Sequence, residues 1–137
     1  MDSFRVLLVD DEEDFLSTVI KRLRKRDVNA HGAGSGEEAL QALEQNPVDV
    51  VLLDVKMPGM DGVQTLREIK NHFPLIEVIM LTAHASMEVA IEGMELGAFD
   101  YLMKPVEIDE LLYKIQDASE KKTLQEKKIE QLTGEKG

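Results

Sequence analysis

The stretch Val48-Asp49-Val50-Val51-Leu52-Leu53-Asp54 decides how this chain is interpreted, because a short apolar run in it ends directly on a carboxylate. An apolar run of this length between polar residues is typical of a buried strand in a parallel sheet. Two further runs also end on charged side chains: residues 6–9 lead to the carboxylates of Asp10 and Asp11, and residues 101–103 lead to the ammonium of Lys104. Parallel sheets bind ligands outside the carboxyl ends of their strands, so we expect these four charged side chains to meet at one rim.

Apolar runs alternate with helical patterns five times along the chain, which indicates an α/β fold with a doubly wound, five-stranded parallel sheet and five helices. We place the strands, in chain order, at Arg5–Val9, Val28–His31, Val48–Leu53, Glu77–Leu81 and Asp100–Met103. In a sheet ordered 2-1-3-4-5 the first and third strands are neighbours at the switch point, where a ligand crevice opens.

Each helix shows apolar residues at helical spacing, and we expect these residues to face the sheet. They are Phe15, Leu16, Val19, Ile20 and Leu23 in the first helix, Ala39, Leu40 and Leu43 in the second, Val63, Leu66 and Ile69 in the third, and Ala90, Ile91 and Met94 in the fourth. Ser35 and Glu38 form a capping box that opens the second helix, and Ser86 is a candidate cap for the fourth.

The composition changes from about Ser119 to Lys, Glu and Gln, which favour a helix but offer little core. We therefore assign residues 1–118 to one domain and residues 119–137 to a helical C-terminal extension or linker. Steps of three and four continue through both parts at Ile108, Leu111, Ile115, Ala118, Lys122, Gln125, Ile129 and Leu132. Two hypotheses stay open: a parallel coiled-coil seam that makes a homodimer, or a solvated helical end.

Length and composition bound the class of protein. The 137 residues suit one domain, and no apolar stretch approaches the roughly 20 residues of a membrane span. The formal net charge of -11 argues against direct nucleic-acid binding and favours a protein partner. The absence of cysteine excludes disulfides, thiolate zinc sites and cysteine nucleophiles. Because no signal-peptide pattern follows Met1, we expect a cytoplasmic location.

The carboxylates of Asp10, Asp11 and Asp54 would repel one another at one rim unless a cation neutralised them. Magnesium fits, because it is usually held by one or two carboxylates together with phosphate oxygens. Thr82 and Lys104, at the ends of the fourth and fifth strands, add a hydroxyl and an ammonium suited to a tetrahedral anion. No residue is placed as a base for an external substrate, so we expect a carboxylate to attack a phosphoryl group itself.

Four motifs in this order resemble the response-regulator receiver domain of bacterial two-component signalling, the CheY-like family. They are Val9-Asp10-Asp11-Glu12, residues 53–62 from Leu53-Asp54 to Asp61-Gly62, Leu81-Thr82-Ala83, and residues 101–105 ending in Lys104-Pro105. The resemblance covers roughly residues 4–118. The sequence Gly97-Ala98-Phe99-Asp100-Tyr101 and the long last helix look most like receivers of the nitrogen-regulation class or of hybrid kinases.

The resemblance implies a role for each matching position. Asp54 would accept the phosphoryl group, and Asp10, Asp11, Asp54 and the backbone carbonyl of Lys56 would hold Mg²⁺. Thr82 and Lys104 would bind the phosphoryl oxygens, and Lys104-Pro105 would be a cis peptide. The remaining roles are a switch formed by Thr82 and Tyr101, and positions that modulate phosphoryl lifetime at Lys56 and His84.

The implied function is that of a switch and not of an enzyme with an external substrate. Its upstream partner would be a sensor histidine kinase or phosphotransfer protein. Its downstream partner would be a separate target or a fused output domain, which would bind the surface of the fourth helix, fifth strand and fifth helix. Asp10 or Asp11 alone could instead be a helix cap, Lys104 a surface lysine and Tyr101 a core aromatic. Two rival functions remain: a haloacid-dehalogenase-type phosphatase, although Asp10-Asp11 departs from its Asp-x-Asp pattern, and a degenerate receiver that only binds proteins.

Overall fold

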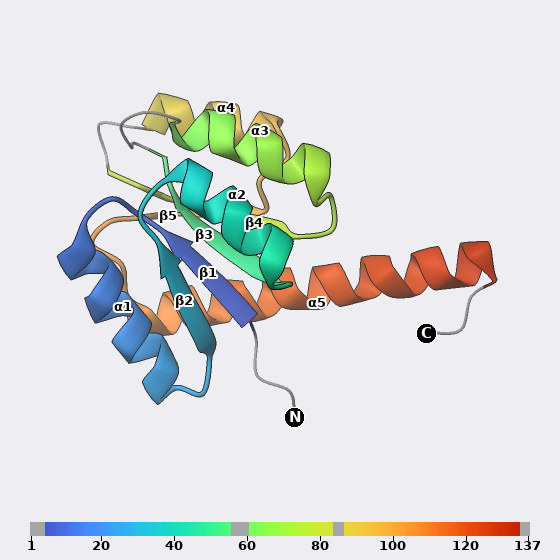
Figure 1. Cartoon of the computed structure of the whole chain (residues 1–137), viewed down its shortest axis with the longest axis horizontal. Helices are drawn as coiled ribbons and strands as arrows, with labels where there is room; N and C mark the ends of the chain where they lie inside the picture. The colour runs from blue at the N-terminus through green and yellow to red at the C-terminus, as the bar shows by residue number, and fades with distance from the viewer. Residues whose placement is uncertain (1–4, 56–60, 84–86, 135–137) are drawn as a thin grey trace.

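The computed structural model describes residues 5–55, 61–83 and 87–134, and the remaining residues appear as a thin grey trace in Figure 1. Strands and helices alternate along the whole chain. In order they are β1 (Arg5–Val9), α1 (Glu13–Lys25), β2 (Asn29–Ala33), α2 (Gly36–Gln45), β3 (Val50–Asp54), α3 (Gly62–His72), β4 (Glu77–Thr82), α4 (Met87–Glu95), β5 (Asp100–Met103) and α5 (Ile108–Thr133). The predicted α/β class is confirmed.

The five strands form one parallel sheet in the order β2-β1-β3-β4-β5, as predicted. Alternate side chains of each strand point to opposite faces, so the sheet has two apolar cores. One core contains Val51 and Leu53 of β3 together with buried residues of α2, α3 and α4. The other contains Val50 and Leu52 together with buried residues of α1 and α5. The sheet is therefore covered by helices on both faces (Figure 1).

Three predicted strands end at different residues in the structure. β2 runs from Asn29 to Ala33 and not from Val28 to His31, because the ladder with β1 pairs Arg5 with Asn29 and Val9 with Ala33. β3 begins at Val50, two residues later than predicted, and includes Asp54. β4 likewise extends by one residue to Thr82. Two residues with functional predictions, Asp54 and Thr82, are thus the last residues of their strands.

The helix caps follow the sequence signals. The Ser35 hydroxyl accepts a hydrogen bond from the backbone N–H of Glu38 at 3.1 Å. The Glu38 carboxylate accepts from the backbone N–H of Gly34 at 3.1 Å, one residue earlier than the usual return bond of a capping box. Asp61 caps α3 by accepting from the N–H of Gln64 at 2.8 Å. The predicted cap Ser86 lies outside the described residues.

The orientation predicted for α4 is wrong in part. Ala90 is buried as expected, but Ile91 and Met94 are 56% and 39% exposed. The buried companion of Ala90 is Gly93, where an added Cβ would lie 2.1 Å from the sulfur of Met80. This close approach of the helix backbone to β4 turns Gly93 inward and leaves Ile91 and Met94 at the surface.

α5 is one continuous helix that extends past the end of the sheet (Figure 1). Leu111, Ile115 and Ala118 are fully buried in the core between the sheet and α5. The predicted coiled-coil seam is therefore wrong over these residues, because their side chains are used inside their own domain. The domain boundary at residue 118 stays a prediction, since the helix shows no break there.

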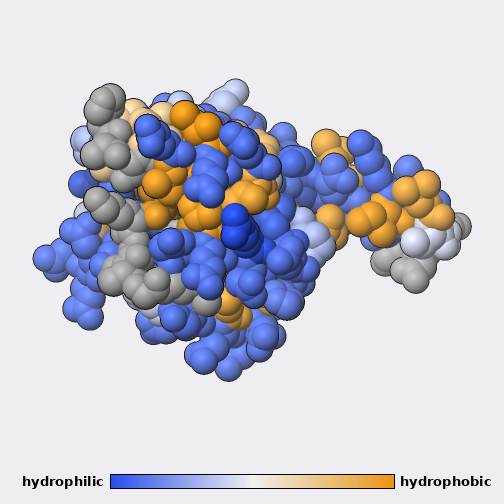
Figure 2. Space-filling model, turned by 90° about the horizontal axis from the view of Figure 1, so that it is seen from above, coloured by the Kyte–Doolittle hydropathy of each residue, from blue (hydrophilic) through white to orange (hydrophobic). Residues whose placement is uncertain are grey.

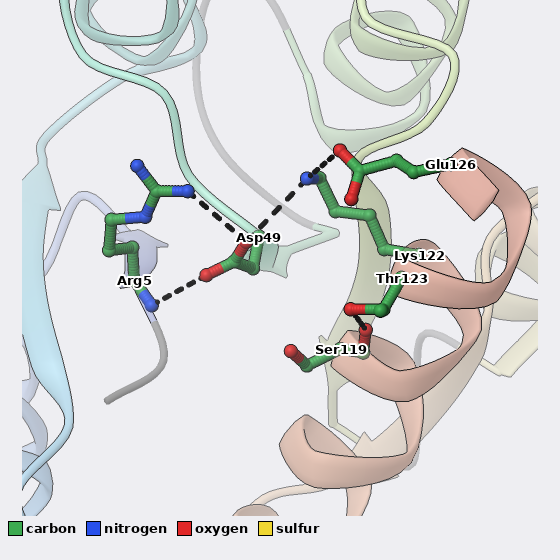
Figure 3. Close-up of polar contacts among 6 residues, drawn as sticks. All are labelled: Arg5, Asp49, Ser119, Lys122, Thr123 and Glu126. Atoms are coloured by element: carbon green, nitrogen blue, oxygen red, sulfur yellow. Dashed lines mark hydrogen bonds and ion pairs between the residues drawn. The ribbon is translucent and has the colours of Figure 1, made fainter. Parts of the chain in front are cut away.

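Two lysines of the extension form ion pairs with carboxylates at the amino ends of the strands. Lys122 Nζ lies 3.6 Å from Asp49 Oδ1, and it also donates to Glu126 at 2.8 Å (Figure 3). Asp49 also accepts from the backbone N–H of Arg5 at 2.9 Å. Lys121 Nζ lies 3.3 Å from Glu77 Oε2. The first turns of the extension are thus tied to residues at the amino ends of β1, β3 and β4.

Candidate functional site

The carboxyl edge of the sheet brings the predicted site residues together. Asp10 follows β1, Asp54 ends β3, Thr82 ends β4 and Lys104 follows β5. The register pairs Val9 with Leu53, which places the residues that follow them side by side on neighbouring strands. Residues separated by up to 94 positions in the chain therefore share one rim, as the sequence predicts.

Asp10, Asp11 and Asp54 each offer a carboxylate oxygen, and these three oxygens lie within 4.8 Å of one another. Asp10 is fully buried and Asp54 is 7% exposed, whereas Asp11 is exposed. A hydrogen bond orients the Asp10 carboxylate: its Oδ1 accepts from the backbone N–H of Glu12 at 2.9 Å. Three carboxylate oxygens can act as metal ligands here, and two of the three side chains are nearly excluded from water. Such a group suits a small hard cation such as Mg²⁺.

The Lys104 ammonium lies inside this acidic group. Its Nζ donates to Asp10 Oδ2 at 2.9 Å, and it is 3.9 Å from Asp54 Oδ2 and 4.0 Å from Glu12 Oε1. It also lies 4.3 Å from the centroid of the Phe15 ring. The bond between Lys104 and Pro105 is cis, as the resemblance implies. The Lys104 side chain is 21% exposed.

Thr82 is fully buried, and its hydroxyl donates to the carbonyl of Ala83 at 3.0 Å. Tyr101 is half-buried on the adjacent strand, where it pairs with Met80, while Thr82 pairs with Met103. Because side chains two residues apart on a strand share a face, Tyr101 and Thr82 lie on the same face of the sheet. This placement is compatible with the predicted switch, whose operation stays a prediction.

Two predicted residues fall outside the described part of the chain: Lys56, whose carbonyl was expected to bind the metal, and His84. Two other residues were not assigned to the site from the sequence. Phe15 was interpreted only as a core-facing side chain of the first helix, and Glu12 only as part of a motif. Their proximity to Lys104 depends on where the start of α1 lies relative to the residue that follows β5, for which the sequence has no local signal.

Comparison with known proteins assigns the chain to a family. Residues 6–116 match the model of the response regulator receiver domain family. The chain is 39% identical over 114 residues to the regulatory protein AtoC of Escherichia coli K12, covering 83% of this chain and 25% of AtoC. It is 40% identical over 103 residues to the DNA-binding transcriptional regulator NtrC of Klebsiella pneumoniae, covering 75% of this chain and 22% of NtrC.

Solved structures show the same relationship. A response regulator receiver domain protein of Clostridium thermocellum superposes with a TM-score of 0.85 at 37% identity, covering 88% of this chain and 98% of that one. NtrX of Brucella abortus superposes with a TM-score of 0.86 at 29% identity, covering 96% of this chain and 30% of NtrX. The chain belongs to the receiver domain family of two-component response regulators, and its relatives include members of the nitrogen-regulation class.

The chain spans about a quarter of the length of the first curated relatives that it matches, 25% of both AtoC and the transcriptional regulatory protein ZraR of Escherichia coli K12. Among the described residues, no helix is both long enough and apolar enough to cross a membrane.

Proposed function

We propose that this chain is a magnesium-dependent phospho-acceptor switch that takes a phosphoryl group from a sensor histidine kinase or a phosphotransfer protein onto Asp54. The observation that carries the proposal is the group formed by Asp10, Asp11 and Asp54 with the Lys104 ammonium 2.9 Å from Asp10. A carboxylate nucleophile, a cation site and a fixed positive charge are the parts that phosphoryl transfer requires.

Each side chain has one task in this proposal. A carboxylate oxygen of Asp54 attacks phosphorus as the bond from phosphorus to the donor histidine breaks, and the donor nitrogen keeps the electron pair. Asp10 and Asp11, with Asp54 and the predicted carbonyl of Lys56, hold Mg²⁺, which neutralises negative charge on the transferred group. The Lys104 ammonium pairs with one phosphoryl oxygen. The Thr82 hydroxyl donates to another after leaving the carbonyl of Ala83.

The output in this proposal is an altered surface for protein binding, with no turnover of an external substrate. Tyr101 lies on β5, the strand that Lys104 follows and that forms the output surface together with α4 and α5. Several large apolar side chains on these elements are exposed, which supports a protein-binding role. They are Ile91 and Met94 on α4, Met103 on β5, and Tyr113 on α5. Because the match covers only about a quarter of the AtoC and NtrC relatives, we propose that the target is a fused output domain or a separate cytoplasmic protein. The net charge of -11 disfavours direct binding of this chain to nucleic acid.

Incubation with acetyl phosphate and magnesium, followed by mass spectrometry, tests the proposal. We expect one adduct of about 80 Da on Asp54, absent in Asp54→Asn and present in Asp14→Asn, a matched change at an exposed carboxylate in the first turn of α1. An adduct on serine, threonine or histidine that persists in Asp54→Asn would sink the assignment. Hydrolysis of p-nitrophenyl phosphate over many turnovers would favour the rival phosphatase.

A further inference from the structure

Phe15 in α1 is the apolar neighbour of the Lys104 ammonium, whose Nζ lies 4.3 Å from the ring centroid. An ammonium at this distance from a phenyl ring is attracted by the negative face of the ring quadrupole. The ring is half-buried and packs on the core cluster that α1 and α5 share with the sheet. Because the core holds the ring in place, the ammonium has a fixed contact at this point.

Three acidic side chains also lie close to Lys104 Nζ. Asp10 lies at 2.9 Å, Asp54 at 3.9 Å and Glu12 at 4.0 Å. Asp10 and Asp54 also belong to the group that suits a hard cation, so a bound cation and Lys104 would compete for the same negative charge. A phenyl ring has no lone pair to offer a hard cation. Its attraction for the ammonium therefore persists when the carboxylates bind the metal.

We propose that Phe15 is a positioning residue that keeps the Lys104 ammonium at the rim of the site while the carboxylates hold a cation. This inference rests on the proposed function, because it concerns the ammonium that would pair with the phosphoryl oxygens. Phe15 acts only through Lys104 and touches no reacting atom. Without the ring, the ammonium would spend part of its time in solvent, and the preorganisation that speeds the transfer would decrease.

Three variants isolate this role. Phe15→Leu keeps an apolar side chain but removes the ring, and Phe15→Tyr keeps the ring. Phe99→Leu is the matched control, because Phe99 packs on the same core cluster but lies at the opposite end of β5, with its ring 5.8 Å from Lys121 Nζ. At saturating magnesium, we expect Phe15→Leu to react with acetyl phosphate about two- to fivefold more slowly, the factor for a partly exposed cation–π contact. Phe15→Tyr restores the rate, and Phe99→Leu leaves it unchanged.

A second readout needs no phosphoryl donor. A ring current shifts the NMR signals of protons above the ring face upfield, so Phe15 should displace those of the Lys104 ε-methylene protons. We expect this displacement in the wild type and in Phe15→Tyr, both with and without magnesium. In Phe15→Leu the signals move to the position of an exposed lysine.

The two readouts separate the failure of this inference from the failure of the proposed function. If the wild type forms no adduct on Asp54, the proposed function fails and this inference fails with it. If the wild type reacts, and Phe15→Leu loses the upfield displacement yet reacts at the wild-type rate, only the positioning role is overturned. Should Phe15→Leu not fold, the wild type alone decides: displacement that disappears when magnesium is added overturns the inference, and displacement that persists supports it.

Discussion

Asp11 is the exposed member of the carboxylate group, so it can be changed without leaving a buried charge unpaired. Because its oxygen lies within 4.8 Å of those of Asp10 and Asp54, we expect Asp11→Asn to weaken magnesium binding by at least about tenfold. In the wild type, magnesium at a hundredfold excess over its Kd should raise the free energy of unfolding by about 2.7 kcal/mol. The variant should need correspondingly more magnesium for the same increase in the free energy of unfolding.

Titration calorimetry of magnesium into the two proteins measures this difference. Asp14→Asn is the matched control, because Asp14 is an exposed carboxylate in the first turn of α1 and lies outside the carboxylate group. Equal magnesium affinity in the wild type and Asp11→Asn would contradict the ligand role. Without metal, the variant should melt no lower than the wild type, since one repelling charge has been removed.

Lys114 on α5 shows how a pair at the surface makes stability depend on pH. Its hydrogen bond to Asp100 raises the pKa of the ammonium above 10.5, with smaller contributions from the charges of Asp100, Glu110 and Asp117. A raised folded-state pKa means that the folded protein holds this proton more tightly than the unfolded chain does. The stabilisation is complete below pH 10.5 and is lost as the pH rises through the folded-state pKa.

We therefore expect Lys114→Gln to be less stable than the wild type at pH 8, with a difference that decreases at pH 11. Urea unfolding at the two pH values measures it. Lys127→Gln, a change at an exposed lysine of the same helix, should show no such dependence. A difference between the wild type and Lys114→Gln that is independent of pH would show that the lost stability comes from packing and not from the charge.

At the scale of an element, the start of α3 packs directly on the end of β3. A Cβ added at Gly62 would lie 2.4 Å from the Cα of Val55 and 2.7 Å from the carbonyl oxygen of Asp54. Both are backbone atoms, which cannot move aside as a flexible side chain can. Gly62 is therefore needed for close packing next to the proposed nucleophile.

We expect Gly62→Ala to lower the free energy of unfolding by about 1–3 kcal/mol, the cost of overpacking. Gly34→Ala is the control, because the nearest atom to its added Cβ is the end of the Glu38 side chain, at 2.9 Å. Urea denaturation compares the two. An equal decrease in the free energy of unfolding of both variants would mean that α3 can shift away from β3 with little loss of stability.

For the molecule as a whole, the structure indicates that the first turns of the extension stabilise the domain. Glu77 is 3% exposed, and its Oε1 has no hydrogen-bond partner among the described residues. Lys121 lies 3.3 Å from its other oxygen, and Lys70 lies 4.0 Å from Oε1. Burial lowers the pKa of Lys70, although the charge of Glu77 opposes this shift. Removal of Lys121 would leave a buried carboxylate with less compensation.

A chain ending at Ala118 should therefore be less stable than the full chain by about 1–3 kcal/mol. A chain that ends at Lys127 and keeps Lys121 and Lys122 should be close to the full chain. Urea unfolding of the three chains decides the matter. If the chain ending at Ala118 is as stable as the others, the extension contributes nothing to the domain.

The homodimer stays a prediction, but the apolar surface of α5 that could pair two copies is smaller than the sequence indicated. With Leu111, Ile115 and Ala118 in the core, the apolar residues left exposed on the extension are Leu124, Ile129 and Leu132, at 58%, 44% and 87%. Figure 2 shows hydrophobic surface on this projecting part of α5. If these residues pair two copies, Leu132→Glu should shift the chain from dimer to monomer in sedimentation equilibrium. A monomeric wild type would rule the pairing out.

The sequence by itself determined the alternation of strands and helices, the rim and most of the predicted site. Asp10, Asp54, Thr82 and Lys104 each mark the end of a strand, and parallel strands place their carboxyl ends at one edge, so local pattern was enough. The family assignment followed from the same four motifs.

Only the tertiary structure decided how α4 is rotated and what α5 contacts. Apolar spacing in α4 predicts a face, but the close packing of Gly93 on Met80 selects a different one. The steps of three and four in α5 are the same for a core stripe and for a coiled-coil seam, and only the sheet next to Leu111 and Ile115 distinguishes them. The contact of Phe15 with Lys104 and that of Lys121 with Glu77 join residues distant in the chain. Such contacts depend on the packing of whole elements, which local spacing does not encode.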